Sequence, residues 1–314
     1  MILDPGRRET DERLAKIEKK LHEIYSQSYS ELKEKADNYF EKFRKADLEK
    51  AKLVKAGQLS EEEYRNWRRT QMLRGKHWNT LKEQSASYIH NVNKIATAYV
   101  NDQLPDIYTL NYNLSARDIE NTVDKISFEM VDARTVKNLS LADGKSFLPY
   151  KKLDPRKDIP WNMRKINNEM LQGVLQGESI PEIAQRFINV GVANEVSAVR
   201  AARTMMTTVE NSARLDSAKR AQENGVILGK IWLSVSDSRT RDWHKQAAYD
   251  YADPIPIDDP FIVNGEEMDA PGDTRASGSN VYNCRCSLGR RVLGFKSILP
   301  QDKQGKIKVV FEDE

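Results

Sequence analysis

Apolar residues recur every three or four positions along the first part of the chain, from Leu14 to Ala46. This spacing places them on one face of a helix whose other faces are charged, so it predicts an amphipathic helix over about residues 10–55. At a rise of 1.5 Å per residue such a helix would be roughly 70 Å long, which is longer than a compact domain needs. The pattern therefore predicts an extended arm.

A second helix is predicted after Gly57, which interrupts the apolar pattern. Ser60 followed three residues later by Glu63 is a capping-box signature, in which each side chain accepts the backbone N–H of the other residue. The apolar stripe continues past Gly75, where we expect a kink, and we expect the helix to end near Pro105. We interpret the two helices as an antiparallel hairpin within one chain rather than as a dimeric coiled coil.

The middle of the chain is predicted to contain a linker. A short helix is expected over about residues 116–130, and the stretch after it, from Gly144 to Pro160, is rich in loop-forming residues. Helical patterns then resume over about residues 162–175, 180–189 and 194–224.

The residue pattern changes after Gly225, where β-type residues dominate positions 227–235 and turn-forming residues follow up to about residue 280. Short apolar runs recur at 261–263, 281–288 and 307–311. The fold class we expect is α+β, mainly α, with a long N-terminal helical hairpin arm followed by a small C-terminal α+β domain. The expected divisions are the hairpin arm over 1–114, a short helix and linker over 115–160, the small domain over 161–300 and a tail over 301–314.

Composition narrows the class of protein. Charged residues make up 31% of the chain and hydrophobic residues 39%, with a mean hydropathy of −0.70, so we expect a modest core and much solvated helix surface. The formal net charge of +3 excludes a global basic field of the kind that alone indicates nucleic-acid binding. Because the sequence lacks a signal-peptide pattern and a long apolar run, we expect a soluble protein that is made in the cytoplasm and does not contact a membrane.

A dense run of distinctive residues lies near the C-terminal end. It opens on a tryptophan, continues with an Asp-x-Arg-Thr segment and a histidine, and closes on Asn-Cys-Arg-Cys. Each fragment alone is weak, but their order and spacing together are specific. The residues are Trp232, Asp237, Arg239, Thr240, His244, Phe261, Pro271, Gly272, Asp273, Asn283, Cys284, Arg285 and Cys286.

In this order the run resembles the C-terminal domain of phage Mu F-like minor head proteins. The N-terminal half also looks like minor head proteins of phages that infect Gram-positive bacteria, in the segments Gly57–Tyr64, Met72–Trp78 and Asn101–Tyr108. The resemblance thus touches most of the chain, and it identifies residues 161–300 as the Mu F-like head morphogenesis domain.

The resemblance implies a structural minor capsid protein of a tailed bacteriophage rather than an enzyme. It implies a location in the virion, inside the head near the portal, with the portal protein, the major capsid or scaffolding protein and packaged double-stranded DNA as partners. It further implies a role in head morphogenesis and in DNA ejection, without a catalytic residue or a cofactor. We expect the hairpin to contact the portal or coat subunits, because its apolar stripe is longer than a two-helix pair needs.

The two cysteines leave two interpretations open. Cys284 and Cys286 are too close in sequence for an easy disulfide. With His244 they could supply three ligands to a tetrahedral zinc ion, with Asp237 or Asp273 as the fourth, in a zinc-stabilised DNA-binding module. Zinc sites more often use a C-x-x-C pair, which favours a small buried thiol pair with a hydrogen-bonded histidine.

A phage-borne effector enzyme is the other alternative, because Mu F-like domains are sometimes joined to toxin domains such as ADP-ribosyltransferases. A transferase or nuclease would need His244 as general acid or base and Arg239 and Arg241 as an electrostatic clamp, beside Glu266 and Glu267. A cysteine–histidine nucleophile would lack an oxyanion hole and an orienting third group. The sequence therefore favours the structural role.

Contact with packaged DNA would need only local Lys and Arg side chains that reach phosphates, without base readout. A solvated helix face explains the same residues, so the resemblance is what favours a DNA contact. The candidates on the predicted helix over 194–224 are Arg200, Arg203, Arg214, Lys219 and Arg220.

Overall fold

The computed structural model describes residues 5–123, 127–142 and 147–295. Helices dominate these residues, and their strands all follow residue 225, which confirms the expected mainly-α, α+β class. Among the described residues, no helix combines the length and the apolar character needed to cross a membrane. The expected tail over 301–314 and the apolar run over 307–311 lie outside the described residues.

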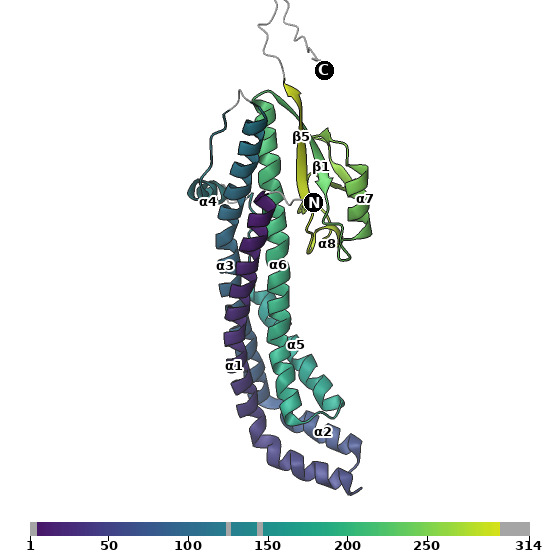
Figure 1. The fold of residues 1–314 in the computed structure, drawn as a ribbon. Coiled ribbons are helices and arrows are strands. Elements are labelled where there is room, and N and C mark those ends of the chain that lie inside the picture. Colours follow the sequence, from purple (N-terminus) through teal and green to yellow (C-terminus); the bar gives the residue numbers. More distant parts are fainter. Residues whose placement is uncertain (1–4, 124–126, 143–146, 296–314) are drawn as a thin grey trace, which may run out of the picture. The chain divides into compact units, whose positions relative to one another are not determined.

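The elements follow one another along the chain as labelled in Figure 1. The helices are α1 (Pro5–Lys55), α2 (Glu61–Met72), α3 (Gly75–Thr122), α4 (Ala133–Ala142), α5 (Pro155–Leu175), α6 (Ile180–Glu223), α7 (Asp242–Asp250) and α8 (Gly278–Val281). The strands are β1 (Val226–Leu233), β2 (Ile255–Pro256), β3 (Phe261–Val263), β4 (Glu266–Met268) and β5 (Ser287–Phe295).

The predicted capping box starts α2. The Ser60 side chain accepts the Glu63 N–H at 3.2 Å, and the Glu63 carboxylate accepts the Ser60 N–H at 3.0 Å. Because the first N–H groups of a helix have no partner within it, these two bonds stabilise the helix start. At the expected kink the chain breaks the helix, and α3 begins at Gly75 with a φ of +87°, a backbone conformation that favours glycine.

Two predicted helix ends are wrong. Pro105 lies inside α3, which continues to Thr122 and so absorbs the first part of the short helix expected over 116–130. Its neighbours Leu104 and Ile107 are almost fully buried, and this burial offsets the hydrogen bond that an internal proline removes. The patterns at 180–189 and 194–224 form the single helix α6, where Gly191 packs closely against the Tyr29 ring.

Contacts divide the chain into two compact units. The first, which we call the C-terminal unit, comprises Met1–Lys16, Asp102–Tyr150 and Arg200–Glu314. The second, which we call the helical unit, comprises Ile17–Asn101 and Lys151–Val199. Each unit is therefore assembled from segments that are far apart in the sequence.

The core of the helical unit draws on α1, α2, α3, α5 and α6. Phe40, Trp78, Met170 and Phe187 are fully or almost fully buried in one apolar cluster. The apolar stripe of the predicted hairpin is thus covered by later helices of the same chain. The stripe is longer than a two-helix pair needs because it also packs on later helices, so its length does not by itself indicate a partner.

The C-terminal unit packs a small sheet and a hairpin against helical segments. Its sheet has the order β2-β1-β5, with β1 antiparallel to β5 so that Trp232 lies opposite Leu288, while β3 and β4 form a separate pair. Trp232 and Phe261 share their apolar core with Ile119 of α3 and Leu215 of α6. Strand β5 runs beside β1 in Figure 1, with α7 and α8 close to them.

Candidate functional site: a buried histidine and two cysteines

The structure brings together three residues of the sequence motif. The Nδ1 atom of His244 lies 3.6 Å from the Cys284 Sγ atom and 3.4 Å from the Cys286 Sγ atom. The ligand atoms of all three residues lie within 4.8 Å of one another, and all three side chains are buried. We call these residues the His-Cys cluster.

Two structural elements position the cluster. His244 lies in the first turn of α7, and its ring meets the rings of Trp232 and Trp243 edge-on, at centroid distances of 5.4 and 6.4 Å. The cysteines lie in the irregular segment that precedes β5, after Asn283, whose φ of +54° turns the chain. The aromatic rings leave the cluster in an apolar environment.

Helix α6 holds the cysteine segment through two buried polar side chains. The Thr207 hydroxyl donates to the Cys284 carbonyl at 2.7 Å, and the Asn211 amide donates to the Cys286 carbonyl at 3.0 Å. The Asn211 side chain also accepts the Leu288 N–H at 2.8 Å. Neither residue was predicted from the sequence, although polar residues among the apolar positions of the long helix were a usable signal.

A salt bridge flanks the cluster. Asp237 accepts hydrogen bonds from both terminal nitrogens of Arg285, and its Oδ1 atom also accepts the Thr240 hydroxyl at 3.0 Å. Donation from Arg285 holds the pKa of Asp237 well below its usual range. The Asp237 carboxylate is therefore bound by Arg285 and by Thr240 of its own turn.

The Pro-Gly-Asp motif is a turn that packs on α6. Gly272 has a φ of +82°, and its carbonyl accepts the Thr208 hydroxyl at 2.7 Å. A Cβ atom on Gly272 would lie 3.2 Å from the Thr208 Cα and N atoms, so the turn approaches the helix backbone closely. The Asp273 carboxylate accepts the Asp269 N–H at 2.9 Å and pairs with Arg275 at 2.6 Å.

The two expected fourth ligands, Asp237 and Asp273, make contacts outside the His-Cys cluster. Within the described residues, the group that could hold a metal consists of the histidine and the two cysteines, without Asp237 or Asp273. Both carboxylates are occupied by arginine side chains instead. The expectation that one of them completes a four-residue set is wrong.

The two thiols differ in their protonation. The pKa of Cys284 is lowered well below its usual range, first because its sulfur is hydrogen-bonded by Cys286 and then because His244 lies beside it. The pKa of Cys286 is raised, because of its hydrogen bond to Cys284 and because of burial. The cluster therefore favours one thiolate and one thiol.

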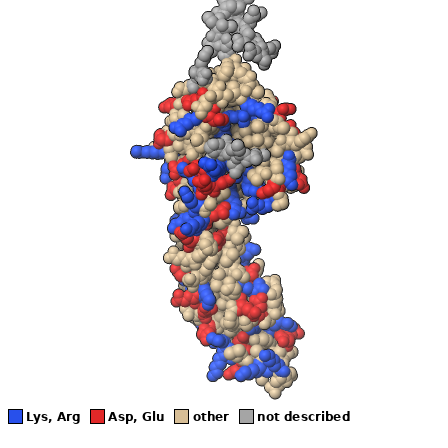
Figure 2. Space-filling view, in the orientation of Figure 1, with Lys and Arg blue, Asp and Glu red and all other residues tan. Residues whose placement is uncertain are grey.

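The basic residues predicted to contact DNA divide into two groups. Arg214 is 3% exposed, pairs with the fully buried Glu210 at 3.1 Å and cannot reach a phosphate, so its prediction as a DNA contact is wrong. Arg220 is exposed and pairs with Glu223, while Arg200, Arg203 and Lys219 are also exposed. Figure 2 shows Lys and Arg interspersed with Asp and Glu on the visible face.

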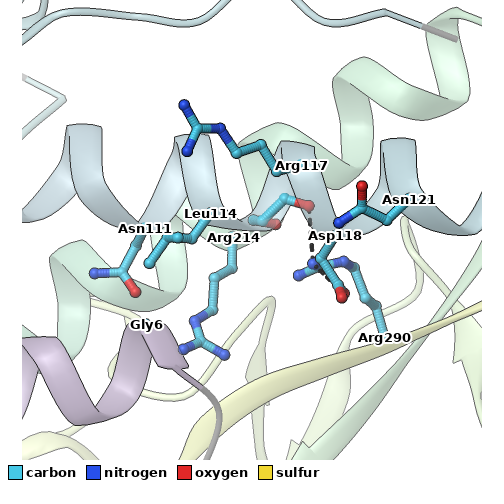
Figure 3. Close-up of a pocket in the computed structure, with 9 residues that line it drawn as sticks. Gly6, Asn111, Leu114, Arg117, Asp118, Asn121, Arg214 and Arg290 are labelled. Carbon is cyan, nitrogen blue, oxygen red and sulfur yellow. Dashed lines mark hydrogen bonds and ion pairs between the residues drawn. The ribbon is translucent and has the colours of Figure 1, made fainter.

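A hollow of about 250 Å³ lies in the C-terminal unit, apart from the His-Cys cluster, and was not predicted from the sequence. Figure 3 shows Arg214 and Arg290 on one side of the α3 segment and Arg117 pointing away from them. Arg290 donates to the Ser115 carbonyl and to Asp118, both at 2.9 Å. These contacts tie β5 to α3.

Comparison with known proteins finds one matching family and two relatives. The sequence profile of the family described as phage Mu protein F like protein matches residues 164–289, a range that contains the whole His-Cys cluster. The chain is also 26% identical to the minor head protein GP7 of Bacillus phage SPP1 over 282 residues, which cover 88% of this chain and 83% of that protein. Residues 164–289 thus match the phage Mu F-like family, and the longer likeness is to a phage minor head protein. The resemblance inferred from the motif residues is thereby confirmed.

A second relative is an enzyme, matched over part of its length. The chain is 27% identical to the NAD(+)–arginine ADP-ribosyltransferase EFV of Enterococcus faecalis over 143 residues. That match covers 46% of this chain and spans 28% of the length of the transferase. No solved structure matches the chain.

Proposed function

We propose that the protein is a structural component of the phage head, located in the virion near the portal vertex, where it acts in head assembly and DNA ejection. The observation that carries the proposal is the likeness to GP7, which extends over 88% of this chain and 83% of the relative. A match of this extent includes residues of both compact units. It therefore supports a shared role for the whole chain.

The contacts of two residues that the alternative enzyme would need support a structural role. Arg241 donates to the Tyr282 carbonyl at 2.5 Å, and Glu266 accepts the Ser277 N–H at 2.9 Å and the Asn280 amide at 2.8 Å. An electrostatic clamp or an acid–base group must be free to meet a substrate. These groups instead hold the loops around α7 and α8.

For contact with the portal, the predicted hairpin offers three exposed apolar side chains rather than a whole stripe. Leu48 and Leu53 of α1 are 56% and 39% exposed, and Ile95 of α3 is 59% exposed. Exposed apolar residues of this kind suit a partly apolar protein interface. We propose that they contact the portal or coat subunits.

Co-purification of the tagged full chain with the portal protein tests this contact, with size-exclusion chromatography and light scattering at low and high salt. Salt-resistant comigration supports a specific apolar contact. Leu48, Leu53 and Ile95 changed together to Glu should abolish it, whereas Leu139→Glu, at a residue of α4 that is 62% exposed, should not. Deletion of residues 8–105 is unsuitable because it removes core residues such as Phe40 and Trp78. Absence of comigration by the unmodified chain would contradict the portal contact.

Contact with packaged DNA is proposed for the exposed basic residues Arg203, Lys219 and Arg220 of α6. Such a contact should be weak and salt-dependent, because released counterions drive it. Changing all three to Gln should reduce the slope of log affinity against log salt by up to about 2–3 units. The same charge change at three exposed residues of the helical unit, Lys157, Arg164 and Lys165, is the control.

Arginine ADP-ribosyl transfer is a second candidate, favoured by the partial likeness to the Enterococcus faecalis transferase. Incubation with labelled NAD and an arginine-containing acceptor tests it. The structural proposal expects no transfer. Labelled product that is lost in both His244→Ala and Glu267→Gln, the latter at an exposed carboxylate of β4, would contradict a purely structural role.

A further inference from the structure

We propose that His244, Cys284 and Cys286 bind a zinc-class divalent metal ion, with a water molecule as the fourth ligand. The ion would join α7 to the segment that leads into β5. This inference does not depend on the portal or DNA contacts.

The separations within the cluster fit a shared ion. With zinc–nitrogen bonds of about 2.0–2.1 Å, zinc–sulfur bonds of about 2.3 Å and tetrahedral angles, nitrogen and sulfur ligands lie roughly 3.5 Å apart. The Nδ1 atom of His244 lies 3.6 and 3.4 Å from the two sulfur atoms. The Nδ1 atom offers either one proton or one lone pair, so it can form one hydrogen bond to one sulfur atom. Two nearly equal distances from Nδ1 to the sulfur atoms therefore fit an ion bound by all three atoms better than a single hydrogen bond.

The local backbone removes the objection that the C-x-C spacing raised. On a regular strand a C-x-C pair would hold both side chains on one face at a fixed spacing, but β5 begins at Ser287, after both cysteines. The left-handed conformation of Asn283 turns the chain just before Cys284, and both sulfur atoms then face the same ring nitrogen. The Cys286 N–H donates to the Cys284 sulfur at 3.4 Å, a contact of the kind that supports a metal-bound thiolate.

The histidine itself needs a strong bond on its Nδ1 side. Its Nε2 atom is buried and has no hydrogen-bond partner among the described residues. The ring is therefore fixed by packing and by the Nδ1 contacts alone. A metal bond supplies the orientation that weak thiol hydrogen bonds do not.

The surroundings hold the ligands in place before an ion binds. Thr207 and Asn211 fix the carbonyls of the two cysteines, and the salt bridge from Asp237 fixes Arg285 between them. Ligands on a segment fixed in this way lose little conformational freedom on binding. Asp237 and Asp273 are engaged by arginines, but a cavity of about 10 Å³ adjoins the cluster, which is about the space that one water molecule needs.

The test uses the full chain purified under reducing conditions. Elemental analysis after addition of zinc and removal of the excess should find about one zinc per chain. Replacement by cobalt should give a thiolate-to-metal charge-transfer band and the visible bands of tetrahedral cobalt. Cys284→Ser and Cys286→Ser should lose both signals, whereas His77→Gln, at an exposed histidine outside the cluster, should keep them.

A second measurement on the unmodified chain covers the case in which the serine variants fail to fold. Bound zinc should protect both thiols from a thiol reagent, and a chelator should expose them and lower the melting temperature. A folded chain that binds less than about one tenth of a zinc per molecule and shows no cobalt bands overturns the proposal. Thiol reactivity that is the same with and without zinc also overturns it.

Discussion

Asp237 and Arg285 form a two-point salt bridge, with the carboxylate accepting Nη1 at 2.8 Å and Nη2 at 2.5 Å. The pair connects the turn after β1 to the segment that carries both cysteines. Because Arg285 lies between Cys284 and Cys286 in the sequence, the salt bridge anchors the segment that carries the two cysteines. A lysine, which offers one ammonium group, cannot reproduce this geometry.

Arg285→Lys should therefore lower the melting temperature and weaken zinc retention. The pKa of Asp237 is depressed in the folded state, so the stabilisation is present above the unfolded-state pKa of about 3.9 and is lost as the pH falls below it. The difference in melting temperature between the unmodified chain and Arg285→Lys should be smaller at pH 3 than at pH 7. Arg239→Lys is the control, since Arg239 is 78% exposed and lies 3.7 Å from Asp237. A difference that is equal at both pH values would contradict this account.

Lys230 should destabilise the fold at neutral pH. It is fully buried in β1, where its ammonium group donates to the Asp269 carbonyl at 2.8 Å, and burial lowers its pKa to about 8. Below pH 8 both folded and unfolded chains carry the proton, and the cost of burying the charge is present in full. Between about pH 8 and 10.5 the unfolded chain binds more protons, so stability rises with pH by up to about 3 kcal/mol.

Lys230→Met separates this effect from other titrations. The free energy of unfolding of Lys230→Met should exceed that of the unmodified chain by the largest amount at pH 7. This excess should decline towards pH 10, as measured by urea denaturation. Lys16→Met removes an exposed lysine and should show a constant difference. A constant difference for Lys230→Met would show that the buried amine does not titrate as inferred.

Glu210 should be among the most sensitive positions of the C-terminal unit. Its carboxylate is fully buried and pairs with Arg7 at 2.9 Å and Arg214 at 3.1 Å. Glu210→Ala leaves two buried arginines without this partner and should cost about 3–5 kcal/mol of unfolding free energy. Glu223→Ala, which breaks an exposed pair with Arg220, should cost less than about 1 kcal/mol. Similar losses for both variants would contradict the ranking.

The start of α2 offers a smaller and more local test. Ser60→Ala removes the side-chain half of the capping box and should cost about 1 kcal/mol of stability in the helical unit. Ser30→Ala is the control, because Ser30 is an exposed serine within α1 and caps no helix. Hydrogen exchange of the first amides of α2 would detect the local loss even if global unfolding changes little.

The sequence predicted the features that depend on local pattern. The periodicity of α1, the capping box of Ser60 and the strand after Gly225 were all recognisable from neighbouring residues. The pattern could not show that α3 continues through Pro105, because burial of Leu104 and Ile107 depends on distant segments. Propensity is a weak guide wherever tertiary packing decides.

The same distinction applies to the candidate site. His244, Cys284 and Cys286 were predicted as a group from their order in the motif, and the structure places them together. Thr207 and Asn211 were missed because their roles depend on carbonyl groups far along the chain. Lys230 carried a signal that was overlooked, since a single lysine within the apolar stretch of β1 must be either exposed or specifically bonded.

The close approach of Gly272 to Thr208 changes how the Pro-Gly-Asp motif should be understood in related sequences. A side chain at position 272 would press on the backbone of α6, whereas Gly57 and Gly75 have open space around them. Selection at position 272 can therefore act on steric fit alone. Recurrence of this glycine in sequences that match the same family would indicate the docking of a loop on a helix, and a conserved motif here need not mark a reactive centre.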